Sequence, residues 1–230
     1  MPIDLPRIQV LCFDVDGTLS DTDDLWTEQL AARLRPLSRF LPNRDPRAFA
    51  RRAIMAAETP GSLLFSALDR VGLDEPLMGL VDWLARHGPR RKPRAFRLIA
   101  QVDLLLPALA QRYPLAAISA NAETTTLSFL EHFSLRPLFR CVATARTCAH
   151  TKPFPDPLVW AAAQIGVPPA SLLMIGDTTV DIRAGRAAGA QTVGVLCGFG
   201  EETELRRAGA GHILPHTAAL ASLLLPPAIG

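Results

Sequence analysis

Two aspartates, Asp14 and Asp16, directly follow the apolar run of residues 8–13 and are separated only by Val15. A buried charge is costly unless a metal ion, a lysine or several hydrogen bonds compensate it. Later segments of the chain contain such compensating groups, so we interpret the two aspartates as functional residues. The alternative is a surface turn after a strand, which an Asp-Gly sequence such as Asp16-Gly17 often marks.

Polar residues also follow, or lie between, the other apolar runs. In an open α/β sheet, ligands bind at the carboxyl ends of the strands. We therefore expect four carboxylates, one lysine and one hydroxyl to meet at one edge of the sheet: Asp14, Asp16, Ser119, Lys152, Asp177 and Asp181.

Four clustered carboxylates repel one another, and a hard divalent cation would relieve that repulsion. Ligands that are all oxygen atoms favour Mg²⁺ over zinc. We expect Asp14 and Asp177 to bind the ion directly, and Asp181 to hold either a metal-bound water or Lys152. Lys152 and Ser119 would supply positive charge and a hydrogen bond, which suit a phosphoryl group.

This combination of groups predicts a two-step phosphoryl transfer. One carboxylate would attack phosphorus and form an aspartyl phosphate. A second would protonate the leaving oxygen and then take a proton from the attacking water. Simpler interpretations remain open for single residues. Asp181 would then complement a helix dipole, Ser119 would cap a turn, and the Asn121 side chain would only order its loop.

The apolar runs predict the elements that position these residues. Runs at 8–13, 115–119, 141–143, 172–175, 192–196 and 212–214 are expected to form strands, and several are apolar throughout, as in strands covered on both faces. Between them we expect a helix capped by Thr124, a helix ending at Gly166, and a helix from Thr179 to Gly189. This alternation predicts an α/β fold with a doubly wound parallel sheet.

Residues 20–95 interrupt the alternation, because they contain leucines at helical spacing and no convincing strand. A charged, proline-flanked stretch at 88–94 resembles a linker. We therefore expect two domains: an α/β core of residues 1–19 and 96–230, and an inserted helical domain of residues 20–95.

The motifs together resemble those of the haloacid dehalogenase superfamily, in the branch with a helical cap inserted after the first strand of a Rossmann-like core. The matching residues are Asp14-Val15-Asp16-Gly17-Thr18-Leu19, Ser119, Lys152-Pro153-Phe154-Pro155-Asp156 and Gly176-Asp177-Thr178-Thr179-Val180-Asp181.

The resemblance implies a role for each matching residue. Asp14 would be the nucleophile, Asp16 the acid and base, and Mg²⁺ would be bound by Asp14, the Asp16 carbonyl and Asp177. Phosphate would contact Ser119, Asn121 and Lys152, with Thr18 and Asp181 in supporting positions.

The resemblance favours a Mg²⁺-dependent phosphatase that acts on a small phosphorylated metabolite, similar to phosphoglycolate phosphatases. A sugar-phosphate mutase would share every core motif. A dehalogenase needs neither Asp16 nor Mg²⁺, and a catalytically silent binding protein would not need the full set of residues.

Composition excludes several other classes. A net charge of +2 is too small to indicate nucleic acid or a membrane surface as partner. No apolar run approaches the ~20 residues that span a bilayer. Asp4 and Pro6 stand where a signal peptide would be basic and then apolar. The four cysteines show no C-x-x-C spacing, which favours a reducing cytoplasm. The oligomeric state is not predicted.

Overall fold

The computed structural model describes residues 3–21 and 96–225, together with Ala32, Arg35, Ser38 and Pro46. The chain divides into two compact units, Met1–Asp21 with Lys92–Gly230 and Thr22–Arg91. The first unit carries every candidate site residue named above, and the following description concerns that unit. The helical domain predicted for residues 20–95 falls almost entirely outside the described residues.

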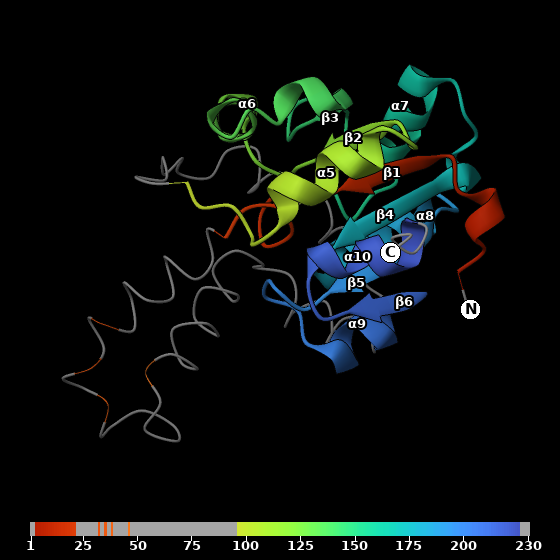
Figure 1. Ribbon diagram of the computed structural model, residues 1–230. Coiled ribbons are helices and arrows are strands. Elements are labelled where there is room, and N and C mark those ends of the chain that lie inside the picture. The colour runs from red at the N-terminus through yellow and green to blue at the C-terminus, as the bar shows by residue number, and fades with distance from the viewer. Residues whose placement is uncertain are drawn as a thin grey trace, which may run out of the picture. The chain divides into compact units, whose positions relative to one another are not determined.

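A six-stranded sheet forms the centre of the first unit (Figure 1). Its strands lie in the order β3-β2-β1-β4-β5-β6, and every neighbouring pair is parallel. The α/β class and the parallel sheet expected from the sequence are therefore confirmed. The strands are β1 (Val10–Phe13), β2 (Leu115–Ile118), β3 (Phe139–Ala143), β4 (Leu172–Gly176), β5 (Gln191–Val195) and β6 (His212–Leu214).

Strand β1 lies at the point where the strand order reverses along the chain. From β1 the chain adds β2 and β3 on one side, and β4, β5 and β6 follow on the other side. The carboxyl ends of β1 and β4 therefore flank a topological switch point, where open α/β sheets bind ligands. Asp14 follows β1 directly and Asp177 follows β4 directly.

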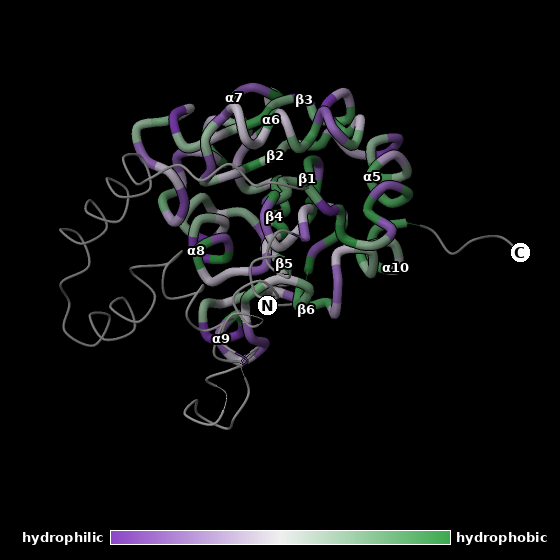
Figure 2. Tube along the Cα trace, turned by 90° about the vertical axis from the view of Figure 1, so that its left-hand side faces the viewer, coloured by the Kyte–Doolittle hydropathy of each residue, from purple (hydrophilic) through white to green (hydrophobic). Residues whose placement is uncertain are grey.

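Helices cover both faces of this sheet. Alternate strand residues point to opposite faces, so Leu11 and Phe13 join one apolar cluster while Val10 and Cys12 join the other. The first cluster includes residues of α5 (Val102–Ala110), α6 (Glu123–His132) and α10 (Leu220–Leu224). The second includes residues of α7 (Asp156–Ile165) and α8 (Thr179–Ala187). In Figure 2, α5 and α10 lie on one side of the strands and α8 on the other.

The element ends differ from the sequence expectations at particular residues. Strand β1 begins at Val10 because residues Leu5–Arg7 form a 3₁₀ turn before it. Helix α6 is capped by Ala122 and not by Thr124, since the N–H groups of Thr125 and Thr126 both donate to the Ala122 carbonyl. Helix α7 ends at Gly166, which has φ +82°, as expected.

Three α-helices in the described residues were not anticipated from the sequence. Helix α5 contains Pro107 and starts after Gln101 in the left-handed region, so its pattern resembles a broken segment. Helices α9 (Glu202–Ala208) and α10 are too short to show a clear period. Among the described residues, no helix is long and apolar enough to cross a membrane.

Candidate active site

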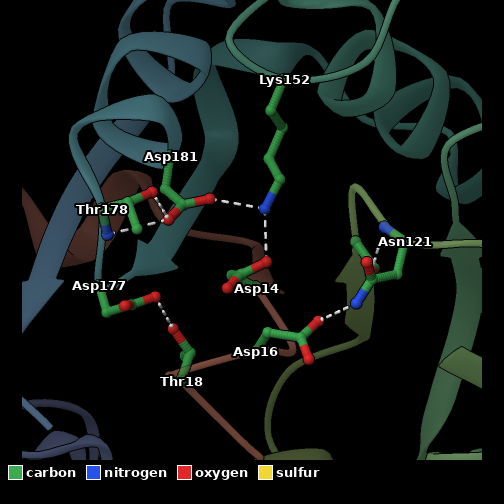
Figure 3. A network of polar contacts seen from close by, with 9 residues as sticks. Asp14, Asp16, Thr18, Asn121, Lys152, Asp177, Thr178 and Asp181 are labelled. Carbon is green, nitrogen blue, oxygen red and sulfur yellow. Dashed lines mark hydrogen bonds and ion pairs between the residues drawn. The ribbon is translucent and has the colours of Figure 1, made fainter. Parts of the chain in front are cut away.

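The loop after β1 is a tight turn that begins on the sheet. The Asp14 N–H donates to the Ile175 carbonyl at 2.9 Å, which keeps Asp14 in register with β4. Gly17 then adopts φ +76°, a conformation that favours glycine. Its N–H donates to the Ser20 carbonyl, and the turn places Thr18 beside Asp177, as Figure 3 shows.

Lys152 lies between two of the buried carboxylates (Figure 3). Its Nζ donates to Oδ1 of Asp14 and, at 2.6 Å, to Oδ1 of Asp181. Burial alone would lower the pKa of Lys152, but the carboxylates of Asp14 and Asp181 raise it above its ordinary value. Lys152 is therefore a charged ammonium group. Burial raises the pKa of Asp14 well above its usual range, while Lys152 opposes that shift.

Asp181 is fixed by the first turn of α8 as well as by Lys152. Its Oδ2 accepts hydrogen bonds from Thr178 N at 3.1 Å and Thr178 Oγ1 at 2.6 Å, which closes a capping box. Gly176 permits this approach, because a Cβ there would lie 2.3 Å from the Asp181 Cβ. Asp181 therefore lies in the first turn of α8 and also contacts Lys152, while its supporting role in the site remains a prediction.

Asp177 is fully buried and held from two directions. Thr18 Oγ1 donates to its Oδ1 at 3.2 Å, and the Phe199 N–H donates to its Oδ2 at 2.9 Å. Burial and the Asp181 carboxylate raise its pKa to about 7, against the opposing hydrogen bond from Phe199. The contribution of Phe199 was missed from the sequence, although Gly198-Phe199-Gly200 after the fifth strand was a usable signal.

Three of these carboxylates could hold a metal ion. Asp14, Asp177 and Asp181 each offer an oxygen, and the three oxygens lie within 4.8 Å of one another. Together with Lys152 they leave two negative charges uncompensated when all are ionised, in a buried site. A set of carboxylate oxygens suits a hard divalent cation such as Mg²⁺. The residues present therefore fit the ion that the sequence predicts.

Asp16 lies on the side of Asp14 that is away from Asp181, close to Asn121 in the loop after β2 (Figure 3). Asn121 Nδ2 donates to Asp16 Oδ2 at 2.7 Å, and the Asn121 backbone N–H donates to Ser119 Oγ at 3.1 Å. The structure thus brings Ser119 and Asn121 to the same edge as the four aspartates and Lys152. The phosphate-binding roles predicted for Ser119, Asn121 and Lys152 remain predictions.

Two residues that follow β5 in the sequence, Cys197 and Thr217, contact the loop after β1. Thr217 is fully buried, and its Oγ1 donates to the Thr18 carbonyl at 2.6 Å. Cys197 Sγ lies 3.4 Å from both the Gly17 carbonyl and Thr217 Oγ1. Nothing in the type or spacing of Thr217 or Cys197 indicates this contact, so sequence reasoning could not have found it.

A parallel α/β sheet with carboxylates and a lysine at its switch point defines a class of hydrolytic enzymes. The chain belongs to the haloacid dehalogenase-like hydrolase family, whose model matches residues 70–195. That family was the resemblance drawn from the motifs, so the expectation is confirmed.

Curated relatives resemble most of the chain. Pyrophosphatase PpaX of Anoxybacillus flavithermus is 29% identical over 190 residues, which cover 82% of this chain and 84% of the relative. A phosphoglycolate phosphatase of Nitrosococcus oceani is 24% identical over 231 residues, covering 96% and 98% of the two chains.

Solved structures share the fold. A predicted phosphoglycolate phosphatase from Haemophilus somnus has a TM-score of 0.62 and 19% identity, with 94% of this chain and 98% of that chain covered. A putative β-phosphoglucomutase from Thermotoga maritima has a TM-score of 0.61 and 18% identity, with the same coverage of both chains.

Proposed function

We propose that this hydrolase is a Mg²⁺-dependent phosphatase that cleaves a small phosphorylated metabolite through an aspartyl-phosphate intermediate. The observation that carries the proposal is the buried ammonium group of Lys152, which contacts both Asp14 and Asp181 beside Asp177. A phosphoryl group brings further negative charge, so its binding requires such fixed positive charge.

Each residue has a distinct task in the proposed reaction. Asp14 attacks phosphorus while the bond from phosphorus to the leaving oxygen breaks, and Asp16 gives that oxygen a proton. Asp16 then takes a proton from the water that releases phosphate from Asp14. Lys152 and Ser119 hold the phosphoryl oxygens throughout. Asp14, Asp177 and the Asp16 carbonyl would hold Mg²⁺, which offsets charge on the phosphoryl group.

The named relatives favour hydrolysis over transfer between positions of one sugar. Relatives covering most of the chain carry the names pyrophosphatase and phosphoglycolate phosphatase. The mutase neighbour shares 18% identity and therefore supports the fold alone. A mutase of this family remains the second candidate, since it would use the same core residues.

We further propose a helical cap for residues 20–95 and a cytoplasmic location.

Purified protein should release phosphate from phenyl phosphate with Mg²⁺ and lose this activity in EDTA. Asp14→Asn removes the nucleophile and Asp16→Asn removes the acid and base, so each should lower kcat by about 10²-fold or more. Undiminished hydrolysis by Asp14→Asn would show that Asp14 is not the nucleophile. A screen of phosphorylated metabolites ranked by kcat/KM identifies the substrate, and a mutase would instead convert a sugar phosphate without net phosphate release.

A further inference from the structure

We propose that Asn121 is a positioning residue that orients the carboxyl group of Asp16 for proton transfer, rather than a phosphate ligand. The inference rests on the proposed phosphatase function and adds a residue to it. Its basis is the 2.7 Å hydrogen bond from Asn121 Nδ2 to Asp16 Oδ2 (Figure 3).

The direction of this hydrogen bond determines how the carboxyl group of Asp16 is oriented. An amide NH₂ group can only donate, so Oδ2 of Asp16 accepts this hydrogen bond. The opposite orientation of the amide would place two oxygens against each other, which is repulsive when Asp16 is ionised. The bond therefore orients the carboxyl group without removing its ability to act as an acid and a base.

The backbone of Asn121 is itself held by hydrogen bonds. Its backbone N–H donates to Ser119 Oγ at 3.1 Å, and its carbonyl accepts from the Ala145 N–H at 2.9 Å. The Ser119 N–H in turn donates to the Ala143 carbonyl at the end of β3. Asn121 is thus tied to the loops after β2 and β3, and a positioning side chain needs such support.

The other three aspartates of the site are also held by donors. Asp14 and Asp181 are held by Lys152, while Asp177 is held by Thr18 and Phe199. All three are buried, whereas Asp16 is partly exposed in the turn after β1. A partly exposed carboxyl group has more rotational freedom, and a donor on a neighbouring loop reduces that freedom.

The two roles of Asn121 predict different kinetics. A phosphate ligand would contact every phosphate ester equally, and its loss would weaken the inhibition by inorganic phosphate. Loss of a residue that acts through Asp16 lowers kcat/KM only for esters whose leaving oxygen needs a proton. Phenyl phosphate needs this proton, while 2,4-dinitrophenyl phosphate does not, because its leaving group is stable as an anion.

The experiment measures kcat/KM of Asn121→Ala for both esters. This constant reports the steps up to departure of the leaving group, whereas the later hydrolysis of aspartyl phosphate is common to both substrates. We expect a loss of about 10-fold or more for phenyl phosphate, a change within about 2-fold for the dinitrophenyl ester, and unchanged inhibition by phosphate. Equal losses on both esters, weakened inhibition by phosphate, or no loss at all would overturn the proposal.

A double-mutant cycle makes the test specific to Asp16. In the Asp16→Asn background, Asn121→Ala should cause no further loss on phenyl phosphate, because the group through which it acts is already absent. Losses that multiply would instead show that Asn121 acts independently. Glu123→Ala, an exposed position two residues further on, is the matched control and should retain wild-type kinetics on both esters.

Failure of this proposal is distinguishable from failure of the proposed function. If the enzyme is not a phosphatase, wild type hydrolyses neither ester, or Asp14→Asn remains active. If only the role of Asn121 is wrong, wild type and Asp14→Asn behave as expected, and the loss of kcat/KM in Asn121→Ala does not depend on the leaving group.

Discussion

At the scale of single residues, the charge balance of the site depends on Lys152. It is the one buried cation that the described part of the chain places against the aspartates, and it contacts two of them. Removing one partner from a buried ion pair leaves an uncompensated charge and typically costs about 3–5 kcal/mol. Lys152 therefore affects both folding stability and the reaction.

Lys152→Met tests this double role. We expect kcat to fall by about 10²-fold or more, because the phosphoryl oxygens lose a fixed positive charge. We also expect the free energy of unfolding to fall by about 3–5 kcal/mol near neutral pH, as measured by urea denaturation. The loss should be smaller in acid, where Asp14, whose pKa burial raises, becomes protonated and no longer repels Asp181.

His150→Ala is the matched control, since it lies in the same loop but contacts Asp156 and Phe154 and not the aspartates that Lys152 contacts. Its Nδ1 is 3.0 Å from Asp156 Oδ1, and its ring packs on Phe154. Activity should be retained in this variant. A Lys152→Met protein with normal stability and kcat would contradict the charge balance described here.

At the scale of elements, the strands were predictable and the contacts between loops were not. Continuous apolar runs identify strands buried on both faces, and Asp14, Lys152 and Asp177 stand out because charged residues follow or lie between such runs. The Phe199 contact depends on a backbone N–H, which every residue except proline carries, so only the flanking Gly198 and Gly200 could have indicated it. Thr217 reaches Thr18 across 199 positions of sequence, a distance over which no local pattern operates.

The loop after β5 gives a prediction at this scale. A Cβ on Gly198 would lie 2.1 Å from Asp177 Oδ2, so Gly198→Ala must displace either the loop or the carboxylate. The Phe199 N–H would then no longer hold Asp177. Because groups that orient metal ligands typically matter 10- to 100-fold, we expect the Mg²⁺ concentration for half-maximal activity to rise by about 10-fold or more.

Gly166→Ala provides the control for a general loss of stability. Gly166 has φ +82° at the end of α7 and no atom within 4 Å of an added Cβ, so alanine there strains the backbone away from the site. This variant should unfold more easily and keep the wild-type Mg²⁺ dependence. An unchanged Mg²⁺ dependence in Gly198→Ala would show that the loop does not position Asp177.

At the scale of the whole molecule, the buried aspartates connect folding stability to pH and to the metal ion. The pKa of Asp177 is about 7 in the folded protein, against an ordinary value of 3.8. Between these two pH values the folded chain holds a proton that the unfolded chain has released. Stability then falls as pH rises through this window, because the unfolded state binds fewer protons. The raised pKa of Asp14 acts in the same direction.

Mg²⁺ should reverse this loss, because it binds ionised carboxylates and the folded state alone brings them together. At about 100 times its dissociation constant, a ligand adds about 2.7 kcal/mol to stability. We expect the difference in Tm between Mg²⁺ and EDTA to be large at about pH 8 and small at about pH 5, where protons compete with the ion. In Asp177→Asn the protein in EDTA should lose less stability between these pH values, and the response to Mg²⁺ should shrink. An equal Mg²⁺ effect at both pH values would mean that the ion binds elsewhere, since the protonated cluster cannot hold it.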